Sequence, residues 1–304
     1  MIYLLLSICC ATFLVVCFRI FDKWNINSTH AIVYNYLVCV ITGLFFVDDF
    51  SFIKDIPSWN GLPFAIVLGT MFYLVFIMVG KNTLDSGIVS TSLAMKLSFV
   101  IPVVIAIVLY GDSITTYKIA GIIFAIVSVY LVTSEDNTDL NDTDSQVLNE
   151  PFVSKRVSKK TRNAFLLPVL IFLGCGLCDS MFNYIQRTKT PEGWDHYVTI
   201  LSFSGAVITA WAANFYKKEL YQWKNVAAGI IMGVPNYFSL YFLLMTLKHL
   251  PLQPSVIFPI NNLGIVCLSA FVGFVLFRET FNRRKLAGFI LAVASIAIIG
   301  FVKK

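Results

Sequence analysis

Apolar residues follow one another along this chain in long runs that short polar segments interrupt. We identify ten such runs, each about 17–24 residues long, at 2–18, 31–47, 61–80, 87–110, 117–133, 164–186, 197–216, 226–247, 254–277 and 286–302. An α-helix rises about 1.5 Å per residue and the hydrocarbon core of a bilayer is about 30 Å thick, so runs of this length predict membrane-spanning helices. The pattern predicts an all-α polytopic membrane protein with ten transmembrane helices.

The composition agrees with this pattern. Of the 304 residues, 58% are hydrophobic and 13% are charged, whereas a soluble domain carries about 25% charged residues. The first run has no basic segment before it and no small-x-small cleavage motif, so we expect a true span rather than a signal peptide. The net charge of +6 lies mostly in the segments between runs. No basic helix accompanies it, so we expect the lipid bilayer as a partner and no nucleic acid.

One polar segment, 134–162, is much longer than the others. Its first half is acidic and its second half is basic, with too few hydrophobic residues to form a core, so it predicts a flexible linker. The linker separates a first half, 1–133, from a second half, 163–304, and each half contains five predicted spans.

The two halves resemble each other. A shift of 167 residues aligns KIAGIIFAIVSVYLV (118–132) with KLAGFILAVASIAII (285–299), and it places Asp112 opposite Glu279. We interpret this match as an internal duplication. Because five is an odd number, the second copy enters the membrane from the opposite face. The halves would then be inverted-topology repeats, an architecture typical of secondary transporters with a substrate site near the midplane.

The paired elements PVVIAIVLYGDSITTYKIAG (102–121) and LSAFVGFVLFRETFNRRKLAG (268–288) carry a family resemblance. They resemble the acid-then-glycine signature of the drug/metabolite transporter superfamily, EamA-like branch, and the resemblance spans the whole chain. It implies a ten-helix, two-repeat carrier of the bacterial inner membrane that moves small metabolites, often outward, through a central cavity. The chain departs from the commonest pattern at Asp112, where glutamate is usual.

The orientation in the membrane stays open, because two signals conflict. The face that holds both predicted termini carries seven Lys and Arg residues and the opposite face carries fifteen. The positive-inside rule then places the termini outside, whereas the family resemblance implies that they are inside.

Lys96 is the first candidate site residue, because it lies about ten residues into the run 87–110 and so about 15 Å deep. An ionisable side chain at the centre of a membrane helix costs about 2.5–3.5 kcal/mol, so it is expected to face a cavity or a partner. Three roles are open: an anchor for an anionic substrate group, a group that changes protonation state during transport, or half of a structural ion pair. Asp179, in the run 164–186, is the best candidate partner, although it could equally pair with Asn183 or water.

A second polar cluster lies in the run 254–277. Pro259 frees the carbonyl of Ser255 and predicts a kink, and Asn261 and Asn262 follow directly. The 167-residue shift places Asn262 opposite Met95, beside Lys96. The two polar clusters therefore occupy equivalent positions in the two halves and should converge on one substrate site, unless the kink is purely structural.

Three further residues are weaker candidates for contact with a substrate. Asn236 and Tyr237 follow Pro235 about ten residues or slightly more into the run 226–247, and Asn35 lies in the run 31–47. Tyr237 shares a helix face with Tyr241, and tyrosines in such a stripe also serve as packing residues.

Asp112 and Glu279 are predicted first of all to cap helix N-termini, because each comes just before the next span. Lys118 and Lys285 follow the two acids at the same spacing and are candidate ion-pair partners. A gating role for the acids is the alternative.

These features predict a secondary transporter of a small polar metabolite, an exporter, that works by alternating access around a midplane site. We expect a proton gradient or an exchanged metabolite to drive it, since the chain has no nucleotide-binding motif. The alternative is a flippase for a lipid-linked intermediate, which would need a lateral groove. No enzymatic activity, metal or cofactor is expected, because the three histidines (His30, His196 and His249) lie at span edges without a cluster of inward carboxylates.

Overall fold

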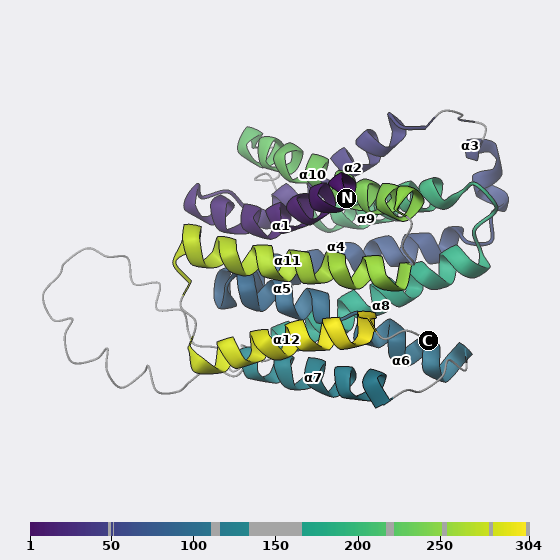
Figure 1. Cartoon of the computed structure of the whole chain (residues 1–304). Coiled ribbons are helices and arrows are strands. Elements are labelled where there is room, and N and C mark those ends of the chain that lie inside the picture. Colours follow the sequence, from purple (N-terminus) through teal and green to yellow (C-terminus); the bar gives the residue numbers. More distant parts are fainter. Residues whose placement is uncertain are drawn as a thin grey trace, which may run out of the picture.

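The computed structural model describes residues 1–47, 50, 52–110, 116–133, 166–216, 222–250, 254–279 and 282–301. Secondary structure in these ranges is helical throughout (Figure 1). The long helices are α1 (Ile2–Lys23), α2 (Ser28–Leu44), α4 (Leu62–Ser86), α5 (Ile88–Leu97), α6 (Val100–Tyr110), α7 (Thr116–Thr133), α8 (Leu166–Thr188), α9 (Asp195–Asn214), α10 (Trp223–His249), α11 (Pro254–Phe277) and α12 (Arg283–Phe301). A short α3 (Phe52–Asp55) and a 3₁₀ turn (Ile56–Ser58) precede α4. The predicted linker lies outside the described residues.

Seven of the predicted spans correspond to helical segments that are long and apolar enough to cross a membrane. These segments are Ile2–Lys23, Leu62–Ser86, Ile88–Ile105, Leu166–Thr188, His196–Asn214, Trp223–Thr246 and Ile260–Phe277. Ser28–Leu44 and Ile119–Leu131 are shorter apolar helices. Large apolar side chains such as Phe271 and Phe274 are exposed on the outer surface, as lipid-facing side chains are. The chain therefore fits an all-helical, multi-pass integral membrane protein.

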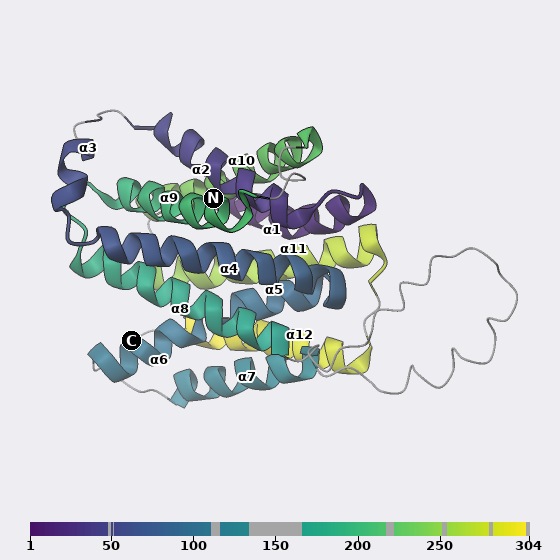
Figure 2. The ribbon, with the colours of Figure 1, turned by 180° about the vertical axis from the view of Figure 1, so that it is seen from behind.

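Helices α7 and α12 lie side by side, as both views of the ribbon show (Figures 1 and 2). Two hydrogen bonds join them: Ser128 Oγ donates to the Gly288 carbonyl at 2.6 Å, and Ser295 Oγ donates to the Gly121 carbonyl at 2.7 Å. The partner of the later residue of α7 is the earlier residue of α12, so the two helices are antiparallel. The contact is also reciprocal, because the 167-residue shift carries Gly121 onto Gly288 and Ser128 onto Ser295.

Two other close helix contacts obey the same shift. Helix α9 packs on α4, where a Cβ added to Gly205 would lie 2.8 Å from Ile66 Cα. Helix α2 packs on α10, where a Cβ added to Gly233 would lie 2.6 Å from Val38 Cβ. The shift carries Ile66 onto Gly233 and Val38 onto Gly205. The two helix pairs therefore cross at equivalent positions, and each crossing contains one glycine. The shift relates α4 to α10 and α2 to α9, so the glycine of α9 and the glycine of α10 do not lie on equivalent helices.

The predicted span 87–110 is broken into α5 and α6 at Ser98 and Phe99. Pro102 explains the break, because it has no N–H to donate to the Ser98 carbonyl and its ring crowds that carbonyl. The Ile101 N–H reaches the same carbonyl instead, at 2.9 Å, in a tighter turn. Pro235 and Pro259 do not interrupt their helices, since α10 and α11 each run continuously through them.

Candidate functional site

Two adjoining cavities lie among the helices, with volumes of about 250 and 300 Å³. The first lies among residues of α1, α2, α4, α5, α8, α9, α10 and α11, and the second extends between α5, α6, α8, α9, α10 and α11. The two cavities share wall residues: Met95, Lys96, Asp179, Phe182, Thr199 and Leu240. Because of this shared wall we treat them as one central cavity.

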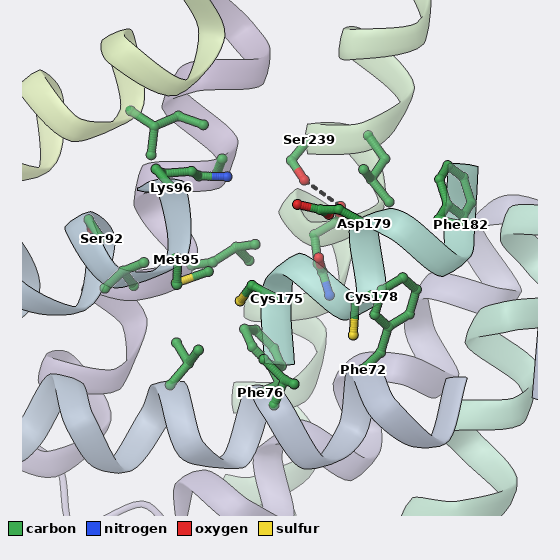
Figure 3. A pocket seen from close by; sticks show the side chains of 18 of the residues that line it. Phe72, Phe76, Ser92, Met95, Lys96, Cys175, Cys178, Asp179, Phe182 and Ser239 are labelled. Atoms are coloured by element: carbon green, nitrogen blue, oxygen red, sulfur yellow. Dashed lines mark hydrogen bonds between the residues drawn. The ribbon is translucent and has the colours of Figure 1, made fainter. Parts of the chain in front are cut away.

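Lys96 and Asp179 line both parts of the central cavity. Their side chains extend toward one another from opposite walls, Lys96 from α5 and Asp179 from α8 (Figure 3). In the described part of the chain their charged atoms do not approach within the 4.0 Å of an ion pair. The break in the helix places Lys96 in the last turn of α5, where the helix dipole favours a cation.

The second polar cluster reaches the same cavity. Asn261 and Asn262 of α11 line its second part together with Lys96, and Asn236 of α10 lines its first part. Three buried polar atoms in the wall, Asn261 Oδ1, Ser92 Oγ and Gln186 Nε2, have no hydrogen-bond partner among the described residues. A buried polar atom without a partner costs about 1–3 kcal/mol. The cavity therefore offers hydrogen-bonding groups that water or a bound solute would satisfy.

Asn35 and Tyr237 lie outside the wall of the cavity. Asn35 is fully buried and accepts a hydrogen bond of 3.2 Å from Asn236 Nδ2, so it contacts a wall residue rather than the cavity. The Tyr237 hydroxyl lies 3.1 Å from His196 Nε2, and its ring stacks on Phe46. Adjacent residues of a helix point about 100° apart, so Asn236 faces the cavity and Tyr237 packs between helices.

One part of the cavity wall is aromatic and sulfur-containing, and it was not predicted from the sequence. Phe72 and Phe76 of α4 lie on one side of the first part, and Tyr36 and Phe203 also line it. On α8 the wall residues are Cys175, Cys178, Asp179 and Phe182. Their spacing of three, four and seven residues is that of one helix face, and this pattern was visible in the sequence.

At one end an apolar cluster separates the central cavity from another cavity. The cluster contains Val15, Val16, Ile20, Ile88, Met95, Val272 and Phe277. Val15 and Met95 also line the central cavity, whereas Phe277 lines a separate cavity beyond the cluster. The opposite part of the cavity extends to the exposed Asn183 near the end of α8.

Glu279 lies beyond the apolar cluster and caps a helix, as predicted, but the helix belongs to the other half. Its carboxylate accepts the N–H groups of Ile88 at 2.7 Å and Val89 at 3.3 Å, in the first turn of α5. Its ion-pair partner is Arg19, at 3.5 Å, and not Lys285. Gly87 leaves room for the carboxylate, because an added Cβ would lie 2.8 Å from Glu279 Oε1. Its φ of 95° is also a conformation that favours glycine. Asp112 lies outside the described residues.

The fold and the cavity define a class, an all-helical membrane protein whose helices enclose a site with two facing opposite charges. No family model matches the chain. The chain is 24% identical over 305 residues to an uncharacterized protein of Haemophilus influenzae, with 99% of this chain and 98% of that protein covered. A solved crystal structure covers 98% of this chain and 94% of its own with a TM-score of 0.54 at 11% identity. This second likeness concerns the fold alone.

Proposed function

We propose that the chain is a secondary transporter of a small polar metabolite, of the drug/metabolite transporter type. The observation that carries the proposal is the pair Lys96 and Asp179, which face each other across a cavity deep among apolar helices. Charged side chains at such depth are expensive and typically mark a substrate or ion pathway. Within the described residues, Lys96 and Asp179 do not form an ion pair with each other. Both charged groups can therefore bind a solute.

Reciprocal contacts support two inverted repeats of five transmembrane helices each. The hydrogen bonds between α7 and α12 and the glycine contacts of α4–α9 and α2–α10 exchange under the 167-residue shift. A reciprocal contact between antiparallel helices requires a two-fold axis perpendicular to them, and hence in the membrane plane if they span it. Secondary transporters with this symmetry bind their substrates at the interface between the repeats.

The chemistry of the wall favours a solute with an anionic group and a short apolar part, such as an amino acid or an organic anion. The Lys96 ammonium would hold the anionic group, Asp179 would hold a cationic or hydrogen-bond-donating group, and the asparagine amides would orient the solute. Phe72, Phe76 and Phe203 would contact its apolar part. Each part of the cavity is near the lower end of the range for small-ligand pockets, which is about 300–1,000 Å³.

One-sided closure of the cavity supports alternating access. The apolar cluster and Glu279 close it at the start of α5, while the cavity extends toward the far end of α8. In the transport cycle we propose, the two repeats rock about the central site, the solute leaves the cell, and a proton gradient or an exchanged metabolite drives the change.

Counterflow in proteoliposomes tests this function. Purified protein would be reconstituted without nucleotide, and a panel of radiolabelled amino acids and organic anions would be scored for exchange against the same unlabelled solute. We expect saturable exchange of at least one solute that Lys96→Met abolishes. The matched control is Lys54→Met, a change of the same type at an exposed lysine of α3.

Two outcomes would overturn the proposal. Absence of exchange across the panel, together with protein-dependent translocation of a fluorescent lipid between leaflets, would favour the flippase alternative. Equal exchange by the Lys96→Met and Lys54→Met variants would show that the charged cavity is not the transport site.

A further inference from the structure

A separate cavity of about 320 Å³ lies beyond the apolar cluster, where α1 ends, α4 meets α5 and α11 meets α12. It shares no wall residue with the central cavity. Its charged wall residues are Arg19, Asp85, Arg278, Glu279 and Lys285. This cavity therefore has its own set of charges, at the end of the protein where the central cavity is closed.

Glu279 demonstrates how this region binds a carboxylate. Its two oxygens accept the N–H groups of Ile88 and Val89, and one of them lies 3.5 Å from Arg19 Nη2. These contacts neutralise Glu279, and the ion pair is made through Nη2 of the guanidinium. Arg19 Nε is buried and has no hydrogen-bond partner among the residues that the structure describes. A guanidinium carries five N–H donors, so the Nε–H of Arg19 is left for a second anion.

Other donors around the cavity are also unused. Ser90 is 4% exposed, and its hydroxyl has no hydrogen-bond partner in the described part of the chain. Within the described residues no carboxylate lies within 4.0 Å of Arg278 or Lys285. Asp85 is the one wall carboxylate that is likewise without an ion pair in the described ranges. After Arg19 and Glu279 cancel, two cations face one carboxylate, so the wall retains a net positive charge.

We propose that this cavity is a second anion-binding site, which takes a phosphate or carboxylate group. Arg19 holds the anion through Nε while it holds Glu279 through Nη2. Ser90 donates its hydroxyl, and Arg278 and Lys285 supply the remaining positive charge. Charge-assisted hydrogen bonds of this type are about twice as strong as neutral ones. Asp85 opposes the anion and limits its affinity. The site shares no wall residue with the central cavity, so binding to it can be measured without transport.

Calorimetric titration of the full-length protein with inorganic phosphate tests the site. The protein would be held in phosphatidylcholine nanodiscs at constant ionic strength, with chloride as the comparison anion. We expect saturable phosphate binding that Arg278→Gln combined with Lys285→Gln weakens by about tenfold or more, because two cationic donors are lost. Asp85→Asn should strengthen binding several-fold, because a repelling charge is removed. Neither change touches the contacts of Glu279, so thermal unfolding should be nearly unaffected.

A matched control separates this site from the central one. Lys96→Met should leave phosphate binding unchanged, even if it abolishes transport. A parallel titration in phosphatidylglycerol nanodiscs distinguishes the two sources of the anion. Competition between that lipid and inorganic phosphate would identify a lipid headgroup as the natural ligand, and absence of competition would identify a soluble anion. Absence of saturable phosphate binding in phosphatidylcholine, or binding that ignores Arg278, Lys285 and Asp85, would overturn the proposal.

Discussion

One experiment separates substrate binding from structural pairing of the two facing charges in the central cavity. Lys96 and Asp179 are replaced by apolar side chains, first one at a time and then together. Lys96→Met keeps the length of the side chain and removes the ammonium. Asp179→Leu keeps the approximate volume and removes the carboxylate. The double variant removes both charges and leaves neither of them alone in the cavity.

The magnitude of the stability effect follows from the separation of the charges. Two unit charges 4 Å apart attract by about 4 kcal/mol at an effective dielectric constant near 20. Lys96 and Asp179 are farther apart than 4.0 Å, so their attraction is smaller. We expect each single variant to lose about 1–3 kcal/mol of folding free energy, since an unpaired charge remains at depth. The double variant should recover most of that loss, because replacing both members of a buried pair by apolar groups is often neutral.

Transport should respond differently from stability. Loss of a charge-assisted hydrogen bond to an anionic solute costs about 1.5–3 kcal/mol, or about 10- to 150-fold in apparent affinity. The double variant should therefore be stable but inactive. The two measurements are thermal unfolding, followed by tryptophan fluorescence in detergent, and counterflow in proteoliposomes, with Lys54→Met as the control for both.

A stable double variant that exchanges solute at the wild-type rate would refute this reasoning, because the two charges would then act only as a structural pair. Independent effects in the stability cycle, with no coupling energy between Lys96 and Asp179, would also contradict it. Lys96→Arg, which retains the positive charge, should keep measurable exchange.

Three further results are expected. Pro102→Ala restores a donor for the Ser98 carbonyl, so α5 and α6 should merge and the protein should gain about 1–3 kcal/mol of stability while transport slows; unchanged unfolding and transport would contradict this. Gly69→Leu drives a side chain into the α9 backbone, so it should cost about 3 kcal/mol or more in thermal unfolding, and a wild-type unfolding temperature would show that the helices are not in close contact there. A hydrophilic thiosulfonate should modify Cys175, which lines the cavity, but not Cys39, which is fully buried, and mass spectrometry that finds equal modification would contradict the assigned wall.

The convergence of the two polar clusters was predictable from the sequence, because the 167-residue match between the halves places them at equivalent positions. The 167-residue shift places Asn262 opposite Met95, and both residues line the second part of the cavity with Lys96. The place of the helix break was not predictable from local sequence. Pro102, Pro235 and Pro259 each remove one helical hydrogen bond, yet only α5–α6 is interrupted among these helices. Whether a membrane helix bends or breaks at proline depends on how neighbouring helices satisfy the freed carbonyl.

Which residues face the cavity was harder to predict, because membrane helices are apolar on most of their surface. In a soluble protein the polar face of a helix marks its exposed side, but here that contrast is weak. Asn236 and Tyr237 were therefore equal candidates in the sequence, although only Asn236 lines the cavity. Likewise, nothing local to Glu279 indicates that it caps α5, 191 residues away in the sequence.

The inverted repeat that we propose also gives a physical reason why, in the described part of the chain, the two ends of the cavity differ. If the halves are related by the 167-residue shift, Gln186 of α8 is the counterpart of Arg19 of α1. Arg19 contributes a full positive charge to the network of Glu279 at the closed end. Gln186 is neutral, it lines the open part of the cavity, and its amide nitrogen has no hydrogen-bond partner. A neutral amide binds a carboxylate more weakly than a guanidinium does. Among the described residues the charged contacts that would favour closure therefore lie at the end that Arg19 occupies, and in the proposed cycle a solute bound between Lys96 and Asp179 would have to offset them to reverse the access.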